Sequence, residues 1–427
     1  MRLFIEEDRR YRLLVIAFCV ATLIVGITAA VKYDNYFLLG NYAEQDNDDV
    51  RYIHGARVLV EQGKLAYFED EPTTFVMPGY PLFLAAVLKV FGAADSDLVY
   101  VRAAQVIIQA LSVYLLYFVG RELFNKRVGL LACFISFLYL PDYVASSLIL
   151  TETLYRFFFI LLFYFSILAL KSRKTKYYII TGVVWGVVCL IRANAATYPL
   201  LLFIFWLVDR YTVREILKYG LIVSVAFFVL MSPWWIRNYN VSGRFIPFTD
   251  SSANPRLLGM FIFWQAPSFA KEIPEELMYD EFVRTVFSAR EGVPEEVQHR
   301  LANYIFITGL KKEPVKYILW HTVGKTAKLY IAPYYWKPIF GVDKVTMGVF
   351  HLFIVIAGIL GFITIKRRRS KGGAVLFVLL LITTVTFLPF ITFDRYGYPQ
   401  MYMFILAAAY YLESMYSKRP TATGEIT

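Results

Sequence analysis

The stretch from Gln45 to Gly79, QDNDDVRYIHGARVLVEQGKLAYFEDEPTTFVMPG, gathers acidic residues in a chain that is otherwise strongly apolar. Of the 427 residues, 58% are hydrophobic and only 18% are charged. A soluble domain usually has about 25% charged residues, so this composition indicates an integral membrane protein. Apolar sequence lies on both sides of the acidic stretch. We therefore expect the stretch to form a loop at the membrane surface that holds a reaction or binding centre.

The net charge of +11 comes from basic residues that lie in short clusters between apolar runs. A multi-pass membrane protein sets its orientation in this way, with Lys and Arg on the cytoplasmic side. The pattern argues against nucleic acid as a partner, because nucleic-acid-binding proteins collect their basic residues on one face. The three cysteines Cys19, Cys133 and Cys189 lie inside apolar runs without metal-site spacing, which is typical of buried structural residues.

Apolar runs of helical length predict about ten transmembrane helices. The expected spans are residues 13–31, 98–119, 128–139, 144–170, 177–191, 195–208, 216–235, 347–365, 374–393 and 401–416. The shorter run at 79–91 follows Pro78 and predicts a re-entrant or interfacial helix. In this topology every cytoplasmic loop carries a basic cluster, at residues 9–12, 121–127, 171–176, 209–218, 366–371 and 417–419.

The sequence thus predicts an all-α integral membrane protein with external juxtamembrane helices and an external loop subdomain. Residues 1–235 form an N-terminal catalytic membrane module, whose first external loop covers residues 33–97. Residues 236–345 form an extracytoplasmic subdomain with interfacial helices, and residues 346–427 form C-terminal transmembrane helices. Both termini are expected in the cytoplasm and the acidic loop outside. A bacterial plasma membrane is the simplest setting.

Acids and arginines at the expected external ends of the spans suggest the chemistry. A carboxylate at the membrane boundary can act as a general base toward a hydroxyl or amine. Arginines at span ends suit a phosphate, because the guanidinium forms paired hydrogen bonds and stays charged when partly desolvated. Acids and arginines together at a lipid surface indicate a phosphorylated lipid substrate.

The order of several motifs resembles a known family of enzymes. The motifs are DDVRYIHGAR (48–57), MPGYPLFLAAVLKVFG (77–92), LILTETLYRFFF (148–159), GVVWGVVCLIRANAATYPLLL (182–202), SPWWIRNYNVSGRFIPF (232–248) and DRYGYP (394–399). They resemble polyprenyl-phosphate-dependent glycosyltransferases of the membrane-embedded C superfamily. The bacterial aminoarabinose transferases and the protein O-mannosyltransferases are nearest in pattern.

The resemblance implies an inverting transfer of a sugar from a polyprenyl-phosphate donor, such as an undecaprenyl-phosphate sugar, to a lipid, glycan or protein acceptor. It implies Asp48 as the catalytic base, and it places Asp49 and Glu152 with it as catalytic candidates. The candidates for binding the lipid phosphate are Arg192, Arg237 and Arg395, with Tyr52 and Tyr80 beside them. The aminoarabinose transferases have Lys-Pro-Pro where this chain has Met77-Pro78-Gly79, so one phosphate-binding cation is missing or comes from elsewhere.

Alternatives stay open at this point. Asp46 and Asp48 form an acid-x-acid pattern that suits Mg²⁺ or Mn²⁺, which leaves a divalent metal open. The arginines are also explained as interfacial anchors, and Glu152 as a structural partner of Arg156 one helical turn away. A lipid or polysaccharide-precursor transporter, with the same charges lining a path, is the alternative function, and a surface-polysaccharide ligase or polymerase is a weaker one.

Overall fold

The computed structural model describes residues 8–285 and 293–416, and all regular elements within these residues are helices. Five helices or helical runs are long and apolar enough to cross a membrane. They contain α2 (Arg9–Tyr33), α5 (Leu98–Leu123), α8 (Glu152–Ser172), α11 (Val213–Ser242) and α17 (Lys344–Arg367). The predicted all-α, multi-pass membrane fold is confirmed.

Shorter apolar helices complete the bundle, so the described residues do not establish the predicted count of ten spans. These helices are α4 (Gly79–Phe91), α9 (Thr175–Ile191), α10 (Pro199–Val208), α18 (Lys371–Phe387) and α20 (Met401–Tyr416). A bent pair, α6 (Lys126–Leu138) and α7 (Pro141–Ser147), turns by 64° and counts as a sixth span at most. The predicted basic cluster at 417–419 lies outside the described residues.

The span predicted at residues 144–170 is present as α8, but it begins later than predicted. Pro141 opens α7, which ends at Ser147, and α8 begins only at Glu152. Between them residues 148–151 leave the helical path. The apolar run at residues 144–170 does not predict this break, because hydrophobic periodicity alone does not locate the end of a buried helix. The break places Glu152 in the first turn of α8.

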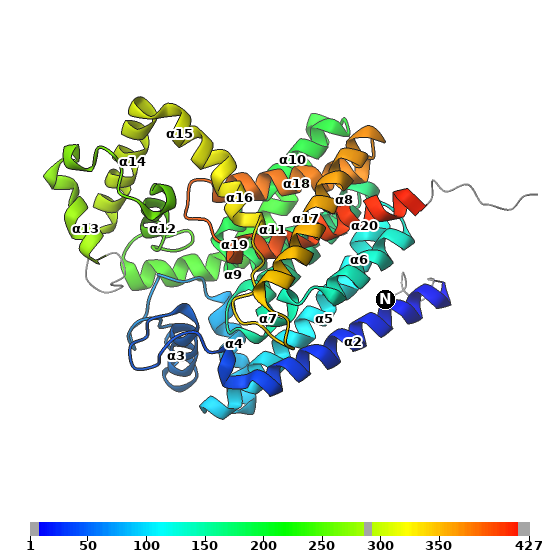
Figure 1. The fold of residues 1–427 in the computed structure, drawn as a ribbon, viewed down its shortest axis with the longest axis horizontal. Coiled ribbons are helices and arrows are strands. Elements are labelled where there is room, and N and C mark those ends of the chain that lie inside the picture. The colour runs from blue at the N-terminus through cyan, green and yellow to red at the C-terminus, as the bar shows by residue number, and fades with distance from the viewer. Residues whose placement is uncertain (1–7, 286–292, 417–427) are drawn as a thin grey trace, which may run out of the picture.

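The core of the bundle surrounds α20, in which every residue from Met401 to Tyr410 is buried. Helices α17 and α6 pack against α20, while α5 packs against α2, α6 and α8 (Figure 1). By contrast, α2 and α11 leave large apolar side chains exposed along their length, including Ile24, Val31, Leu217 and Leu221. Exposed apolar faces on helices of spanning length are suited to contact with lipid.

Two polar regions lie at one end of the bundle (Figure 1). The first external loop forms α3 (Asp48–Gln62), and the chain between α11 and α17 forms α12 (Ala253–Leu258), α13 (Tyr279–Thr285), α14 (Glu295–Lys312), α15 (Pro314–Leu319) and α16 (Lys325–Tyr330). Helices α12 to α15 share a separate apolar core that includes Leu257, Phe282, Leu301 and Ile305. The Thr74 hydroxyl donates to Asp250 at 2.7 Å and joins the two regions.

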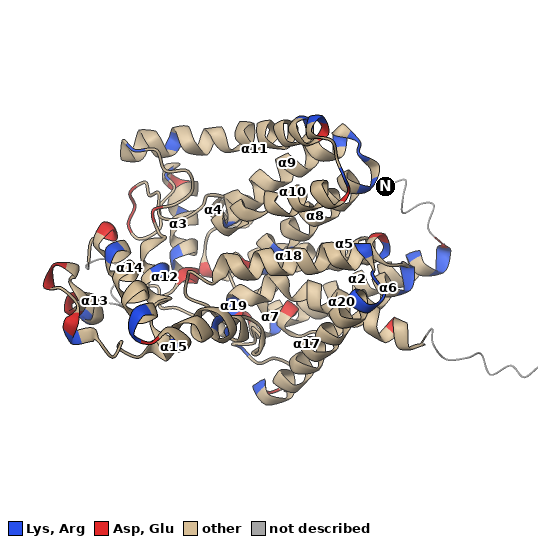
Figure 2. Ribbon diagram, turned by 90° about the horizontal axis from the view of Figure 1, so that it is seen from above, with Lys and Arg blue, Asp and Glu red and all other residues tan. Residues whose placement is uncertain are grey.

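Ion pairs connect the basic loops at the opposite end of the bundle. Lys171 pairs with Glu122 at 3.0 Å, Arg173 with Glu215 at 3.0 Å, and Lys371 with Asp209 at 2.8 Å. The basic clusters at 121–127, 171–176, 209–218 and 366–371 therefore lie together, and Figure 2 shows Lys and Arg gathered at this end near the N-terminus. Their shared location agrees with the loop alternation expected from the sequence.

Candidate active site

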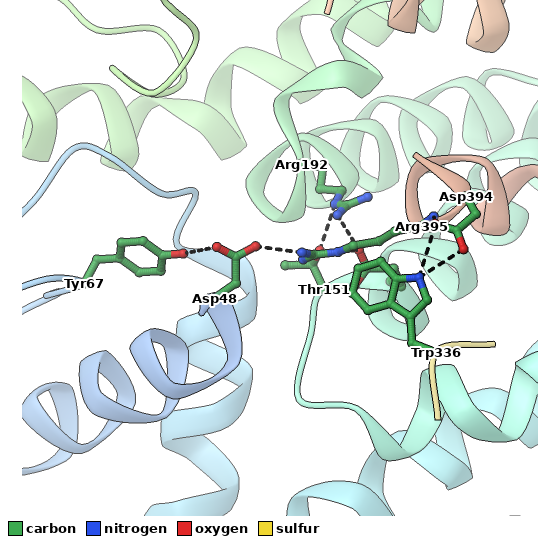
Figure 3. A network of polar contacts seen from close by, with 8 residues as sticks. Asp48, Tyr67, Thr151, Arg192, Trp336, Asp394 and Arg395 are labelled. Atoms are coloured by element: carbon green, nitrogen blue, oxygen red, sulfur yellow. Dashed lines mark hydrogen bonds and ion pairs between the residues drawn. The ribbon is translucent and has the colours of Figure 1, made fainter. Parts of the chain in front are cut away.

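Helix α3 brings Asp48 into a polar network, where it lies between Tyr67 and Arg395 (Figure 3). The Asp48 side chain is 38% exposed. One carboxylate oxygen accepts the Tyr67 hydroxyl at 2.8 Å, and the other accepts Nη1 of Arg395 at 2.7 Å. Gly55 lets α3 lie close to the segment that carries Tyr67, since a Cβ there would meet the Ala66 carbonyl oxygen at 2.2 Å.

Glu152 is connected to Asp48 through Arg395, which contacts both carboxylates. It is fully buried at the start of α8. Its Oε1 accepts Nη2 of Arg192 at 2.5 Å and also accepts Nε of Arg395. Arg192 directly follows α9, and its Nε donates to the Thr151 hydroxyl at 2.8 Å. The unwound residues between α7 and α8 thus place Thr151 and Glu152 side by side against one guanidinium.

Arg395 belongs to the short helix α19 (Asp394–Gly397), which joins the two carboxylates. Asp394 accepts the backbone N–H of Arg395 at 2.9 Å and the Trp336 indole N–H at 3.0 Å, which fixes the start of α19. Gly397 lies directly against α16, where a Cβ would meet the Leu329 carbonyl oxygen at 1.8 Å. The DRYG segment is therefore held at a close backbone contact that requires glycine.

We call Asp48, Glu152, Arg192 and Arg395 the ion-pair cluster. Its two carboxylates and two guanidiniums balance in charge, which is the condition under which charges are tolerated in a low-dielectric interior. Each guanidinium has five N–H donors, and the contacts above use only two on each arginine. Glu152 Oε2 and the buried Tyr334 hydroxyl also lack partners among the described residues. The cluster thus keeps hydrogen-bonding capacity for a ligand.

The neighbouring acids Asp48 and Asp49 lie in opposite electrostatic environments. Burial raises the pKa of the Asp48 carboxyl, but Arg395 and the Tyr67 hydroxyl outweigh this effect and hold that pKa below its ordinary value. Burial raises the pKa of Asp49, which is 1% exposed. Asp49 accepts the backbone N–H groups of Leu39 at 2.6 Å and Val50 at 2.9 Å. Asp48 is ionised and faces the cluster, whereas Asp49 holds the backbone before α3.

Three of the predicted phosphate-binding residues lie outside the cluster. Arg237 donates to the carbonyl oxygens of Thr73 and Leu65, so it holds the first external loop against α11. The Tyr80 hydroxyl donates to Gln105 at 2.9 Å inside the bundle. Tyr52 packs edge-on between Tyr67 and Tyr80, with ring centroids at 5.3 and 5.0 Å. The structure joins only Arg192 and Arg395 to the carboxylates.

The alternative partner for Glu152 is not the one that the structure forms. Arg156 instead pairs with buried Asp142 and donates to the Tyr398 hydroxyl at 2.8 Å. Sequence reasoning missed Tyr67, Thr151 and Trp336 as members of the network. Thr151 had a usable signal, because it directly precedes Glu152. The other two reach the network through loops whose course the sequence did not predict.

The contacts of the predicted metal ligands do not favour a divalent ion. Asp46 accepts the backbone N–H of Asn41 at 2.7 Å within its loop, and Asp48 faces the Arg395 guanidinium, which repels a second cation. Among the described residues, no three His, Cys, Asp or Glu side chains form a group that could hold a metal ion. We assign no step of the chemistry to a metal.

Residues 70–236 match the family described as dolichyl-phosphate-mannose-protein mannosyltransferase. This segment includes Glu152 and Arg192 but neither Asp48 nor Arg395. No curated protein matches the chain in sequence. The match covers less than half of the chain and shows that this segment is similar to a mannosyltransferase family, so the predicted resemblance to glycosyltransferases is confirmed.

Two solved structures show that the fold of this chain has known relatives, and a third matches more distantly. The archaeal oligosaccharyltransferase AglB from Archaeoglobus fulgidus, in complex with an inhibitory peptide and a dolichol-phosphate, covers 94% of this chain at 15% identity with a TM-score of 0.56. Its apo form covers 95% at 16% identity with a TM-score of 0.57. This chain spans about half of their length, 50% and 51%. ArnT from Cupriavidus metallidurans bound to undecaprenyl phosphate covers 96% of this chain and 78% of its own at 15% identity, with a TM-score of 0.45.

Proposed function

We propose that this protein is an inverting glycosyltransferase that moves a sugar from a polyprenyl-phosphate donor to an acceptor at the extracytoplasmic membrane face. The observation that carries the proposal is the ion-pair cluster, in which Asp48 of the external loop meets Arg395 and, through Glu152, Arg192. The cluster lies at the end of the bundle opposite the basic loops, and basic loops mark the cytoplasmic side. The termini are accordingly cytoplasmic, with the donor entering from the outer leaflet.

The roles of the residues follow from their charge and position. Asp48 accepts the proton of an acceptor hydroxyl or amine, whose oxygen or nitrogen then attacks the anomeric carbon of the sugar. The bond between that carbon and the phosphate oxygen breaks on the opposite face, so the configuration inverts. The lipid phosphate leaves with its added negative charge beside Arg192 and Arg395, whose unused N–H groups stabilise it.

Donor binding also strengthens the base in this scheme. Before the donor arrives, Arg395 pairs with Asp48 and lowers the pKa of its carboxyl. A phosphate that binds Arg395 competes for the same guanidinium and brings negative charge close to Asp48, and both effects raise that pKa. Asp48 therefore becomes a stronger base when the donor is bound, which couples proton removal to the presence of the sugar.

The experiment that tests the proposal is release of undecaprenyl phosphate from a panel of undecaprenyl-phosphate sugars by the purified full chain in nanodiscs. A membrane lipid extract supplies acceptors, and EDTA is present or absent. Asp48→Asn keeps the size of the side chain but removes the base, so we expect turnover to fall by at least about 10²–10⁴-fold. The matched control is Asp70→Asn in the same loop, since Asp70 is exposed and contacts His54 instead of the cluster.

Undiminished turnover in Asp48→Asn would remove this residue from the base role. Loss of turnover with EDTA would show a metal requirement that the contacts of Asp48 do not suggest. No turnover with any donor, together with unchanged lipid binding, would favour the transporter alternative. The location of the ion-pair cluster argues against transport, because α3 and α19 lie at the end of the bundle away from the basic loops, whereas transporters bind substrate near the membrane midplane.

A further inference from the structure

A buried lysine, Lys325, and a half-buried one, Lys328, lie beside the active site. They line a pocket between η4 (Ile262–Trp264), the helical run of η7 (Trp320–Gly324) with α16, and the linker from α18 to α19. We call this the lysine pocket, and its principal side chains are Phe263, Trp264, Trp320, Lys325, Lys328 and Thr392.

The lysine pocket offers hydrogen-bond donors without matching acceptors. Lys325 is 1% exposed, and its Nζ donates to the Leu388 carbonyl oxygen at 2.6 Å, which uses one of three N–H groups. Trp320 is 8% exposed, and its buried indole N–H has no partner in the described part of the chain. Lys328 lies 5.9 Å from the centre of the Phe263 ring. No Asp or Glu is among the residues that line the pocket.

An unpaired buried ammonium is costly, so its retention calls for a ligand that compensates it. Burial lowers the pKa of Lys325 to about 7, which is the direction expected for a cation without an anionic neighbour. A group with several acceptor oxygens and negative charge matches two lysines and an indole N–H. The chemistry of the lining therefore favours a phosphate.

The lysine pocket adjoins the active site without being part of it. Trp264 stacks on Phe393 with ring centroids 6.0 Å apart, and Phe393 directly precedes Asp394 and Arg395. Thr392 of the same linker lines the pocket. Phe263 and Trp264 are 63% and 49% exposed, which gives the pocket an aromatic mouth suited to the membrane interface or a sugar ring.

We propose that the lysine pocket binds a phosphate group of the acceptor, separately from the donor phosphate at Arg192 and Arg395. The assignment of this phosphate to the acceptor substrate rests on the proposed transferase function. The binding of a phosphate to the pocket does not depend on that function. The same phosphate chemistry occurs in a lipid headgroup and in a soluble phosphorylated sugar.

Binding of two probes to the full chain tests the proposal without any need for turnover. Inorganic phosphate is measured by equilibrium dialysis, and dioleoyl phosphatidic acid against dioleoyl phosphatidylcholine is measured by native mass spectrometry. Trp320→Phe keeps the packing and removes one neutral donor, so the affinity should fall about 3–10-fold. Lys328→Gln and Lys325→Met remove charged donors and should weaken binding by about 10-fold or more. Lys271→Gln removes an exposed lysine of the same subdomain and should leave binding unchanged.

The outcomes separate the two proposals. Phosphatidic acid bound in preference to phosphatidylcholine assigns the phosphate to a lipid, and binding of inorganic phosphate alone assigns it to a soluble acceptor. Equal binding by all variants, or no binding of either probe, would overturn the phosphate site. Displacement of the probe by undecaprenyl phosphate would overturn the assignment to the acceptor. Asp48→Asn should lose turnover and keep probe binding, so failure of the transferase proposal is seen in turnover alone.

Discussion

The ion-pair cluster and the lysine pocket are two buried charged regions joined by the short linker before α19, yet they handle charge in opposite ways. In the cluster, Glu152 is fully buried and contacts two guanidiniums. In the pocket, Lys325 is 1% exposed and contacts a single carbonyl oxygen. The charges in the cluster compensate one another, whereas Lys325 forms no ion pair with any described residue. The comparison teaches that a buried charge can be compensated by ion pairs in one place and left with a single neutral acceptor in another.

The strongest test of this comparison is to replace Arg395, a cation of the ion-pair cluster, by methionine. Arg395→Met leaves Asp48 without its guanidinium and Glu152 with one of two. Removing one partner of a buried ion pair typically costs about 3–5 kcal/mol, and we expect a loss of that size in the free energy of unfolding. Thermal unfolding in detergent measures it. A melting temperature within a degree or two of the parent protein would mean that the cluster is not compensated in the way described.

The neighbours Asp48 and Asp49 offer a second, smaller contrast within α3. Asp49→Asn replaces a carboxylate oxygen that accepts backbone N–H groups with an amide group that donates, so one buried N–H loses its acceptor. The expected loss of stability is about 1–3 kcal/mol, with transfer retained in the folded fraction. Asp48→Asn should lose transfer altogether, and its cost in stability should be smaller than that of Arg395→Met, because the Asp48 side chain is 38% exposed and the amide oxygen can still accept a hydrogen bond from Arg395. Loss of turnover per folded molecule in Asp49→Asn would return Asp49 to the catalytic residues.

Some of the site was readable from the sequence because its residues follow strong local signals. Asp48 opens a helix within an acidic loop, and Arg395 lies in DRYGYP between two apolar runs. Both were predicted for the external face, and both are found in the cluster. Arg192 directly follows an apolar helix and was predicted for the same reason. Residues at the ends of apolar runs are readable because the membrane fixes where such runs begin and end.

The remaining parts depend on contacts between distant segments, which a single sequence does not contain. Arg237 has the same local signal as Arg192, at the end of an apolar run, but it holds loop carbonyl oxygens instead of the cluster. The lysine pocket was missed entirely, since Lys325 lies in an ordinary amphipathic stretch and only the fold buries it. The burial of Lys325 beside the Trp320 indole depends on the tertiary structure, and no local sequence pattern predicts it.

The pH dependence of anion binding tests whether protonated Lys325 binds the anion in the lysine pocket. Sulfate serves as the probe because its charge is constant between pH 6 and 8. Lys325 is protonated below a pKa of about 7, so sulfate should bind up to about tenfold more weakly at pH 8 than at pH 6. His321 and Lys328 also lie near this ammonium, and burial together with Lys325 lowers the pKa of His321 to about 4, which keeps it neutral throughout. Equilibrium dialysis of Lys328→Gln should preserve the trend, whereas Lys325→Met should abolish it. A pH-independent affinity in the parent protein would exclude Lys325 as a ligand.

Lys325→Met is the counterpart of Arg395→Met and should give the smallest change in stability. The substitution leaves the Leu388 carbonyl oxygen without its donor, which costs about 1 kcal/mol, but it also removes an uncompensated buried charge. The two effects oppose each other, so at pH 7 we expect unfolding free energies within about 1 kcal/mol of each other.

The difference in the free energy of unfolding between the parent protein and Lys325→Met should change with pH. Because burial lowers the pKa of Lys325 from 10.5 to about 7, the unfolded chain binds a proton that the folded chain releases between these values. The parent protein should therefore gain stability from this group as the pH rises above about 7, and the variant should lack that gain. Melting temperatures of both proteins at pH 7 and pH 9 measure the difference. If Lys325→Met instead loses as much stability as Arg395→Met, Lys325 has a compensating anionic partner and the pocket belongs with the cluster.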